Sequence, residues 1–258
     1  MRYKIVAGNW KMNLNAKDGR KLVKDIAKGV AAFKKMPDNV QIVVSPTAPY
    51  LSLLLKSIPK EMRSFFHVAA QNCHAENGGA FTGEVAPAML KDIGCDSVII
   101  GHSERRKYFG ETDDLLAKKI DQALANELGV IYCCGELVEQ RQANCHFDVV
   151  SQQVKQALFH LDKEAFENIV IAYEPVWAIG TGLTATPEQA EEMHAHIRQL
   201  IATKYTNKLA NDTTILYGGS VKPANAKELF SQKNVDGGLV GGASLKADSF
   251  LPIIEAII

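Results

Sequence analysis

The sequence predicts an α/β fold in which eight parallel strands, each followed by a helix, close into a (β/α)8 barrel. Short apolar, β-branched runs recur without polar alternation, which is typical of strands covered on both faces. Amphipathic segments separate these runs, as in repeated βα units. The chain has 258 residues, within the range of one α/β barrel, and contains no Pro/Ser-rich linker or low-complexity tract. We therefore expect a single domain spanning residues 1–258.

The expected strands lie at residues 3–8, 40–45, 65–70, 96–101, 129–134, 168–173, 213–218 and 235–241. The last of these has the weakest pattern, because Gly237 and Gly238 lower its strand propensity. A doubly wound open sheet is the main alternative architecture. The sequence does not favour it, because no G-x-G-x-x-G fingerprint follows the first run.

Two of the intervening segments have a clear helical face. The apolar positions of the first are Leu22, Val23, Ile26, Ala27, Val30 and Phe33, and those of the second are Ala190, Met193, Ile197, Leu200 and Ile201. The second helix is expected to begin with a hydroxyl cap at Thr186, proline at Pro187 and Gln189 at the third position. His194 and His196 are only two residues apart on this helix, so we expect both at the surface.

Composition and charge exclude several classes of function. Hydrophobic residues make up 47% of the chain, and Lys+Arg and Asp+Glu each number 29, so the formal net charge is zero. No global field attracts nucleic acid or an acidic membrane, and an anionic ligand must be held by local groups. The longest uncharged stretch, 39–55, contains Pro46 and Pro49 and is not a membrane span.

The five cysteines are odd in number and lack the spacing of a metal site. Cys73-His74 and Cys145-His146 are isolated pairs, so no metal is expected at either. Cys133 and Cys134 are expected to pack in the core. Reduced thiols and a cytoplasmic location follow as the simplest interpretation.

Chemically useful residues follow five of the expected strands, in the segments "AGNWKMN", "GHSERR", "AYEPVWAIGTG", "YGGSV" and "VGGAS". In a barrel these segments converge on one rim, where function resides. Each residue alone has an ordinary explanation: Glu174 as a paired strand-end carboxylate, His102 as a core histidine, Lys11 as a solvated amine. Together they predict an active site that combines a base, an imidazole and glycine turns.

The same segments, in this order and with "QN…GAFTGE" between the first two, resemble the triosephosphate isomerase family over essentially the whole chain. The resemblance implies a TIM barrel that interconverts dihydroxyacetone phosphate and D-glyceraldehyde 3-phosphate through an enediolate, with no metal and no organic cofactor. It implies roles in glycolysis and gluconeogenesis.

The resemblance also implies roles for the strand-end residues. Glu174 is the expected base that moves a proton between adjacent carbons, and a neutral His102 is the expected hydrogen-bond donor to the enediolate, as described for this enzyme family. Lys11 supplies positive charge, Asn9 supplies a further donor, and Glu104 orients Lys11.

The phosphate of the substrate is expected to bind where the backbone approaches closely. The implied phosphate-site residues are Asn9, Lys11, Gly180, Ser220, Leu239, Gly241 and Gly242. A lid over residues 178–181, with hinges at 175–177 and 182–184, is expected to close on this group and exclude water. Leu183 replaces the lysine of many relatives, a change expected to affect lid kinetics rather than chemistry.

A second copy of the chain is the expected macromolecular partner. The loop 71–84, from Gln71 to Glu84, resembles the segment that reaches into the other subunit of a homodimer, with Thr82 at its tip. Neither nucleic acid nor a membrane is expected as a partner.

Two other functions are compatible with a barrel. One is an aldolase in which Lys11 forms a Schiff base with substrate. The other is a catalytically silent barrel that serves as a binding protein or scaffold. The presence of Glu174, His102 and the lid glycines argues against the second alternative.

Overall fold

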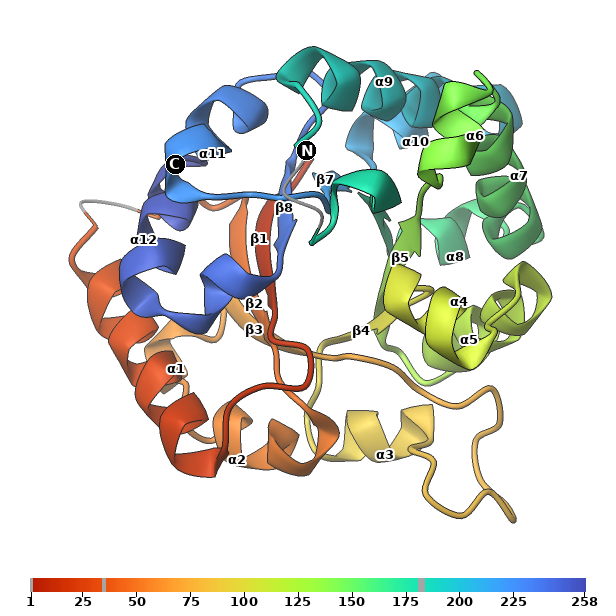
Figure 1. Cartoon of the computed structure of the whole chain (residues 1–258). Helices are drawn as coiled ribbons and strands as arrows, with labels where there is room; N and C mark the ends of the chain where they lie inside the picture. The colour runs from red at the N-terminus through yellow and green to blue at the C-terminus, as the bar shows by residue number, and fades with distance from the viewer. Residues whose placement is uncertain (1, 34–35, 181–183) are drawn as a thin grey trace.

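Strands and helices alternate along the chain, and the strands form a central ring (Figure 1). The computed structural model describes residues 2–33, 36–180 and 184–258. The strands within these residues are β1 (Lys4–Asn9), β2 (Val40–Ser45), β3 (Phe66–Ala70), β4 (Ser97–Ile100), β5 (Gly129–Cys134), β6 (Ile169–Tyr173), β7 (Ile215–Tyr217) and β8 (Gly237–Val240). They pair in sequential order, all in parallel, and β8 closes on β1. The predicted (β/α)8 barrel is confirmed and the open-sheet alternative is wrong.

Helices form the outer layer around the strands (Figure 1). The helices of the described residues are α1 (Ala16–Ala31), α2 (Leu51–Leu55), α3 (Pro87–Asp92), α4 (Ser103–Phe109), α5 (Asp113–Ala125), α6 (Val138–Gln142), α7 (His146–Leu158), α8 (Lys163–Phe166), α9 (Pro187–Lys204), α10 (Asn207–Asp212), α11 (Pro223–Phe230) and α12 (Ala247–Glu255). Short 3-10 helices are η1 (Ala48–Tyr50), η2 (Lys60–Met62), η3 (Val176–Ala178) and η4 (Gly242–Leu245).

Alternation along each strand divides the core into two layers. Side chains such as Ile5 and Ala7 of β1 fill the barrel interior, together with Ile99 of β4 and Leu216 of β7. The intervening Val6 belongs to the larger cluster between the strands and the helices. Both faces of each strand are therefore buried, which explains the continuous apolar runs of the sequence.

The glycines that weaken the pattern of β8 are required by its packing. Gly237 has a φ of 126°, and a Cβ at this position would collide with the carbonyl of Ile5 on β1. Only glycine combines this conformation with so close an approach of two backbones. Low strand propensity here is thus a condition of barrel closure.

The start of α9 matches its sequence signature. The Gln189 N–H donates to Thr186 Oγ1 at 3.2 Å, and the Thr186 N–H donates to Gln189 Oε1 at 3.0 Å. This reciprocal cap fixes where the segment following β6 rejoins the outer layer. No helix among residues 2–33, 36–180 and 184–258 is both long and apolar enough to cross a membrane.

The expectation that His194 lies at the surface is wrong. Its side chain is fully buried between α9 and β7, and Nδ1 lies 3.2 Å from the carbonyl oxygen of Asn234. Burial lowers the pKa of His194 to about 3, so the ring is neutral in the folded protein. His196 is partly exposed, and its Nε2 lies 2.8 Å from Ser151 Oγ.

Candidate active site

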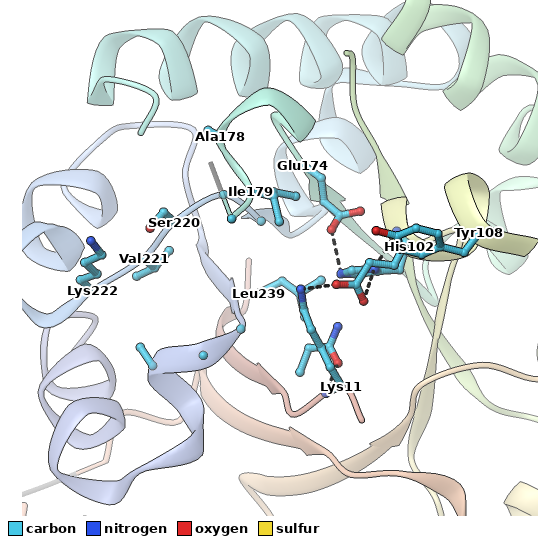
Figure 2. Close-up of a pocket in the computed structure, with 18 residues that line it drawn as sticks. Lys11, His102, Tyr108, Glu174, Ala178, Ile179, Ser220, Val221, Lys222 and Leu239 are labelled. Atoms are coloured by element: carbon cyan, nitrogen blue, oxygen red, sulfur yellow. Dashed lines mark hydrogen bonds and ion pairs between the residues drawn. The ribbon is translucent and has the colours of Figure 1, made fainter. Parts of the chain in front are cut away.

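A cavity of about 620 Å³ opens at the carboxyl ends of the strands (Figure 2). All the residues that the sequence assigns to the site line this cavity: Asn9, Lys11, His102, Glu104, Glu174, Gly180, Ser220, Leu239, Gly241 and Gly242. They lie at the carboxyl ends of β1, β4, β6, β7 and β8 or in the segments that follow these strands, so closure of the barrel brings together residues far apart in the chain. Their individual roles stay predictions.

Glu174 is the first residue after β6, and its backbone N–H still donates to the carbonyl of Cys134 at 2.7 Å. Its side chain is only 2% exposed. The carboxylate accepts from Ser103 N at 2.8 Å and Ser103 Oγ at 3.3 Å, and one oxygen lies 3.0 Å from His102 Nε2. Burial favours the neutral acid, but His102, the Ser103 N–H and Lys11 outweigh it, and the pKa of Glu174 is lowered.

His102 precedes α4 and acts as the N-cap of this helix. Its Nδ1 accepts the backbone N–H of Glu104 at 3.2 Å, which places the proton of the neutral ring on Nε2, facing Glu174. Burial opposes charge on the ring, but the carboxylates of Glu174 and Glu104 favour it, and the pKa of His102 is raised. Because Glu174 is the main favourable influence, departure of its carboxylate would remove most of this rise.

The backbone of Lys11 is held in an unusual conformation. Its φ is 52°, a region that residues other than glycine rarely adopt, and such strain is often found at functional sites. The Lys11 N–H donates to Asn9 Oδ1 at 3.0 Å, and Gln71 Nε2 donates to the Lys11 carbonyl at 2.8 Å. Lys11 Nζ then lies 2.6 Å from Glu104 Oε1. Bonds to the backbone and to the amine of Lys11 therefore hold this side chain in the cavity (Figure 2).

Glycines form part of the cavity wall. A Cβ on Gly218 would lie 2.8 Å from Glu174 Cγ, so this glycine leaves room for the carboxylate side chain. A Cβ on Gly241 would meet only Lys11 Cε, at 3.7 Å, and one on Gly242 would meet nothing within 4 Å. The backbone of these two glycines is therefore open to a ligand at the start of η4, where N–H groups favour anions.

The sequence pointed to neither Ser103 nor Glu136, yet both hold the segment that carries Glu174. Glu136 is fully buried, and its Oε1 accepts from Tyr173 OH at 3.0 Å and Trp177 Nε1 at 2.8 Å. The guanidinium of Arg141 lies 3.1 Å from the same oxygen. One carboxylate therefore anchors both ends of the 174–176 turn. Its place directly after β5 in "CCGE" is the signal that could have identified it.

Part of the expected lid is visible. Ala178, Ile179 and Gly180 line the cavity, and Gly180 has a φ of 70°. The end of the expected lid, the start of its second hinge and Leu183 fall within residues 181–183, which lie outside the described residues.

The two cysteines at the end of β5, Cys133 and Cys134, are buried, and burial raises the pKa of both thiols well above the ordinary value. The predicted packing role of this pair is confirmed. In the part of the chain that the structure describes, no group of three or more His, Cys, Asp or Glu side chains could hold a metal ion.

Comparisons with known proteins show the family to which the chain is similar. A family model described as triosephosphate isomerase matches residues 4–257. The chain is 52% identical over 256 residues to a triosephosphate isomerase of Porphyromonas gingivalis strain W83, covering 99% of this chain and 100% of the relative. It is 49% identical over 259 residues to that of Flavobacterium psychrophilum, with 100% coverage of both, and 50% identical over 252 residues to that of Rhodopirellula baltica, with 98% and 96% coverage. The chain therefore belongs to the triosephosphate isomerase family.

Proposed function

We infer that the chain interconverts dihydroxyacetone phosphate and D-glyceraldehyde 3-phosphate by proton transfer through an enediolate. The observation that carries this conclusion is the convergence of Glu174, the Nε2 of His102 and open glycine backbone on one cavity. The family to which the chain belongs is named for the same reaction. Neither alternative from the sequence gains support: the Lys11 amine is in an ion pair with Glu104, and the relatives compared are isomerases.

Glu174 is the base in this proposal. Its lowered pKa keeps it ionised, and an ionised carboxylate can remove a proton from the carbon beside the substrate carbonyl. The electron pair of the broken C–H bond forms the enediolate, and the protonated acid then returns its proton to the adjacent carbon. To reach substrate, the carboxylate must leave Ser103, which holds it in this structure.

His102 acts on the oxygens while Glu174 acts on the carbons. The substrate carbonyl replaces Glu174 as the partner of Nε2–H, so that the ring donates a proton to the developing oxyanion and recovers one from the neighbouring hydroxyl. The bond from Glu104 N to Nδ1 holds the ring in position. Loss of the Glu174 contact favours the neutral ring that this exchange needs.

Lys11 and Asn9 stabilise the negative charge that develops on the substrate, and Glu104 positions the Lys11 amine. Backbone N–H groups bind the phosphate, since a neutral protein must hold a dianion by local donors. The residues assigned to phosphate are Asn9, Lys11, Gly180, Ser220, Leu239, Gly241 and Gly242. Contact of Gly180 with this group draws the lid closed, which excludes water from the enediolate.

The base is tested by Glu174→Asp, which withdraws the carboxylate by about 1 Å and should lower kcat roughly a hundredfold. The matched control is Glu192→Asp, because Glu192 is an exposed residue of α9 outside the cavity. A coupled assay with glyceraldehyde 3-phosphate measures turnover, and circular dichroism checks the fold. Unchanged turnover in Glu174→Asp would refute the assignment.

We propose that the active form is a homodimer joined through the loop 71–84. This loop projects from the barrel after β3 (Figure 1), and Thr82 is exposed. Beside it a second cavity of about 460 Å³ is lined by Lys11, Gln71 and Phe109 among others. Met12 is 91% exposed and Phe109 67% exposed near this face, large apolar groups that a partner would cover. A fully active monomer in a gel-filtration dilution series would contradict the dimer.

We place the protein in the cytoplasm, where it would serve glycolysis and gluconeogenesis as one barrel domain spanning 1–258. Its cysteines are all unpaired, which suits a reducing compartment. Cell fractionation followed by the coupled assay tests the location. A single cooperative unfolding transition tests the domain assignment.

A further inference from the structure

The charges around the cavity are poorly matched to a phosphate dianion unless a second lysine takes part. Lys11 is paired with Glu104, which leaves the carboxylate of Glu174 as an additional negative charge. With His102 neutral, these side chains sum to a formal charge of minus one. Lys222 is the further cation among the described residues that line the cavity, and it brings the sum to zero.

Lys222 lies on the side of the cavity that the proposed function assigns to phosphate. It follows Ser220 by two positions and lies beside it and Val221, across the cavity from Glu174 (Figure 2). None of the ion pairs formed among the described residues involves Lys222. Its amine is therefore available to an incoming anion.

The backbone of Lys222 is fixed although its side chain is exposed. The Lys222 N–H donates to Asn225 Oδ1 at 2.7 Å, and Asn225 Nδ2 donates to the Ser220 carbonyl at 3.0 Å. Asn225 therefore links the backbone of Lys222 to that of Ser220. These bonds use the backbone of Lys222, so a substitution of its side chain leaves them in place.

We propose that Lys222 is a specificity-determining residue that attracts the phosphate dianion and raises the preference for phosphorylated over uncharged three-carbon substrates. The proposal rests on the proposed isomerase function. An exposed cation at the rim of a cavity increases the local concentration of an anion and its rate of association, and salt screens this effect. Lys222 lies on the other side of the cavity from Glu174 and His102 (Figure 2), so we expect its substitution to change KM rather than kcat.

The test compares Lys222→Gln and Lys222→Glu with Lys227→Gln and Lys227→Glu. Lys227 is an exposed lysine of α11, the helix that Lys222 precedes, and it does not line the cavity. At low ionic strength, kcat/KM for glyceraldehyde 3-phosphate should fall about threefold in Lys222→Gln and about tenfold in Lys222→Glu. The Lys227 variants should stay within about 1.5-fold, and the Lys222 deficits should shrink to about twofold or less near 0.5 M salt.

The uncharged substrate D-glyceraldehyde separates recognition of phosphate from a general structural effect. We expect kcat/KM for D-glyceraldehyde to be the same in Lys222→Glu and wild type. Equal losses with both substrates, or losses no larger than those of the Lys227 variants, would overturn it.

Binding of inorganic phosphate, measured by calorimetry, keeps this inference separate from the isomerase assignment. Wild-type protein that binds phosphate, with affinity reduced in Lys222→Glu, supports a role for Lys222 even if turnover is absent. Equal phosphate affinity in the two proteins contradicts the role even if turnover is normal.

Discussion

The two ends of the barrel both contain buried charges, but they satisfy them differently. At the amino end, Arg198 bonds with Asn234, Asp236 and the carbonyls of Ala210 and Thr213, which occupies all five of its N–H donors. At the carboxyl end, Glu174 and His102 contact each other and Ser103 while facing a cavity. Saturated bonding is typical of a structural network, whereas groups with exchangeable partners can act on a ligand.

Substitution of Arg198 should lower the stability of the fold strongly, because it breaks the hydrogen-bond network at the amino end of the barrel. Arg198→Met removes one of the two arginines that pair with Asp236 and leaves the carbonyls of Ala210 and Thr213 without the guanidinium, which should lower the free energy of unfolding by about 3 kcal/mol. Urea denaturation measures this loss. The folded fraction should keep its kcat, because none of these groups faces the substrate cavity. A large fall in kcat with unchanged stability would reverse the roles assigned to the two ends.

Glu136→Gln tests whether a buried carboxylate at the carboxyl end positions the segment that carries Glu174. Its carboxylate accepts from Tyr173 and Trp177 and pairs with Arg141, so the amide weakens the anchor of the segment that carries Glu174. We expect kcat/KM to fall about tenfold, which corresponds to one charge-assisted hydrogen bond of about 1.5 kcal/mol. Steady-state kinetics and denaturation together check this outcome. Normal kinetics in a strongly destabilised variant would make Glu136 a purely structural residue.

A change in stability that is visible only as pH varies is expected from His194. The folded ring has a pKa of about 3, while the unfolded ring titrates near 6.5, so below this pH the unfolded state binds the extra proton. The free energy of unfolding should therefore fall as pH drops from about 6.5 toward 3, by up to about 1.4 kcal/mol per pH unit from this group.

His194→Gln removes that titration, so its stability should depend less steeply on pH over the same interval. Denaturant midpoints at several pH values compare the two slopes. Parallel slopes would show that the buried ring does not contribute.

Burial of His194 could have been predicted from the sequence. It lies four residues after Ala190 and three before Ile197, which places it on the apolar face of α9. The two-residue spacing of His194 and His196 places them on different sides of the helix, so it does not predict that both are exposed. The helical period, rather than the polarity of imidazole, decides which side of this helix a residue faces.

The strands could be predicted from local patterns, because apolar runs mark them. The strand-end residues could be predicted as well, because parallel strands bring their carboxyl ends together. Ser103 and Glu136 could not, because their partners are distant in sequence. Ser103 and Glu174 are 71 residues apart, and Glu136 and Trp177 are 41 apart. Gly237 of β8 gave a misleading local signal, because glycine is needed there for the close approach of the Ile5 carbonyl, which belongs to a strand at the other end of the chain.

The proposed reaction requires Glu174 to exchange its contacts with Ser103 and His102 for contacts with the reacting carbons. A crystal structure with 2-phosphoglycolate, an anionic mimic of the enediolate, tests it most directly. We expect the Glu174 carboxylate to move beyond hydrogen-bond distance of Ser103 N, about 3.5 Å, and to lie against the mimic while His102 Nε2 contacts its oxygen. A carboxylate still bonded to Ser103 N and turned away from the bound mimic would contradict the account.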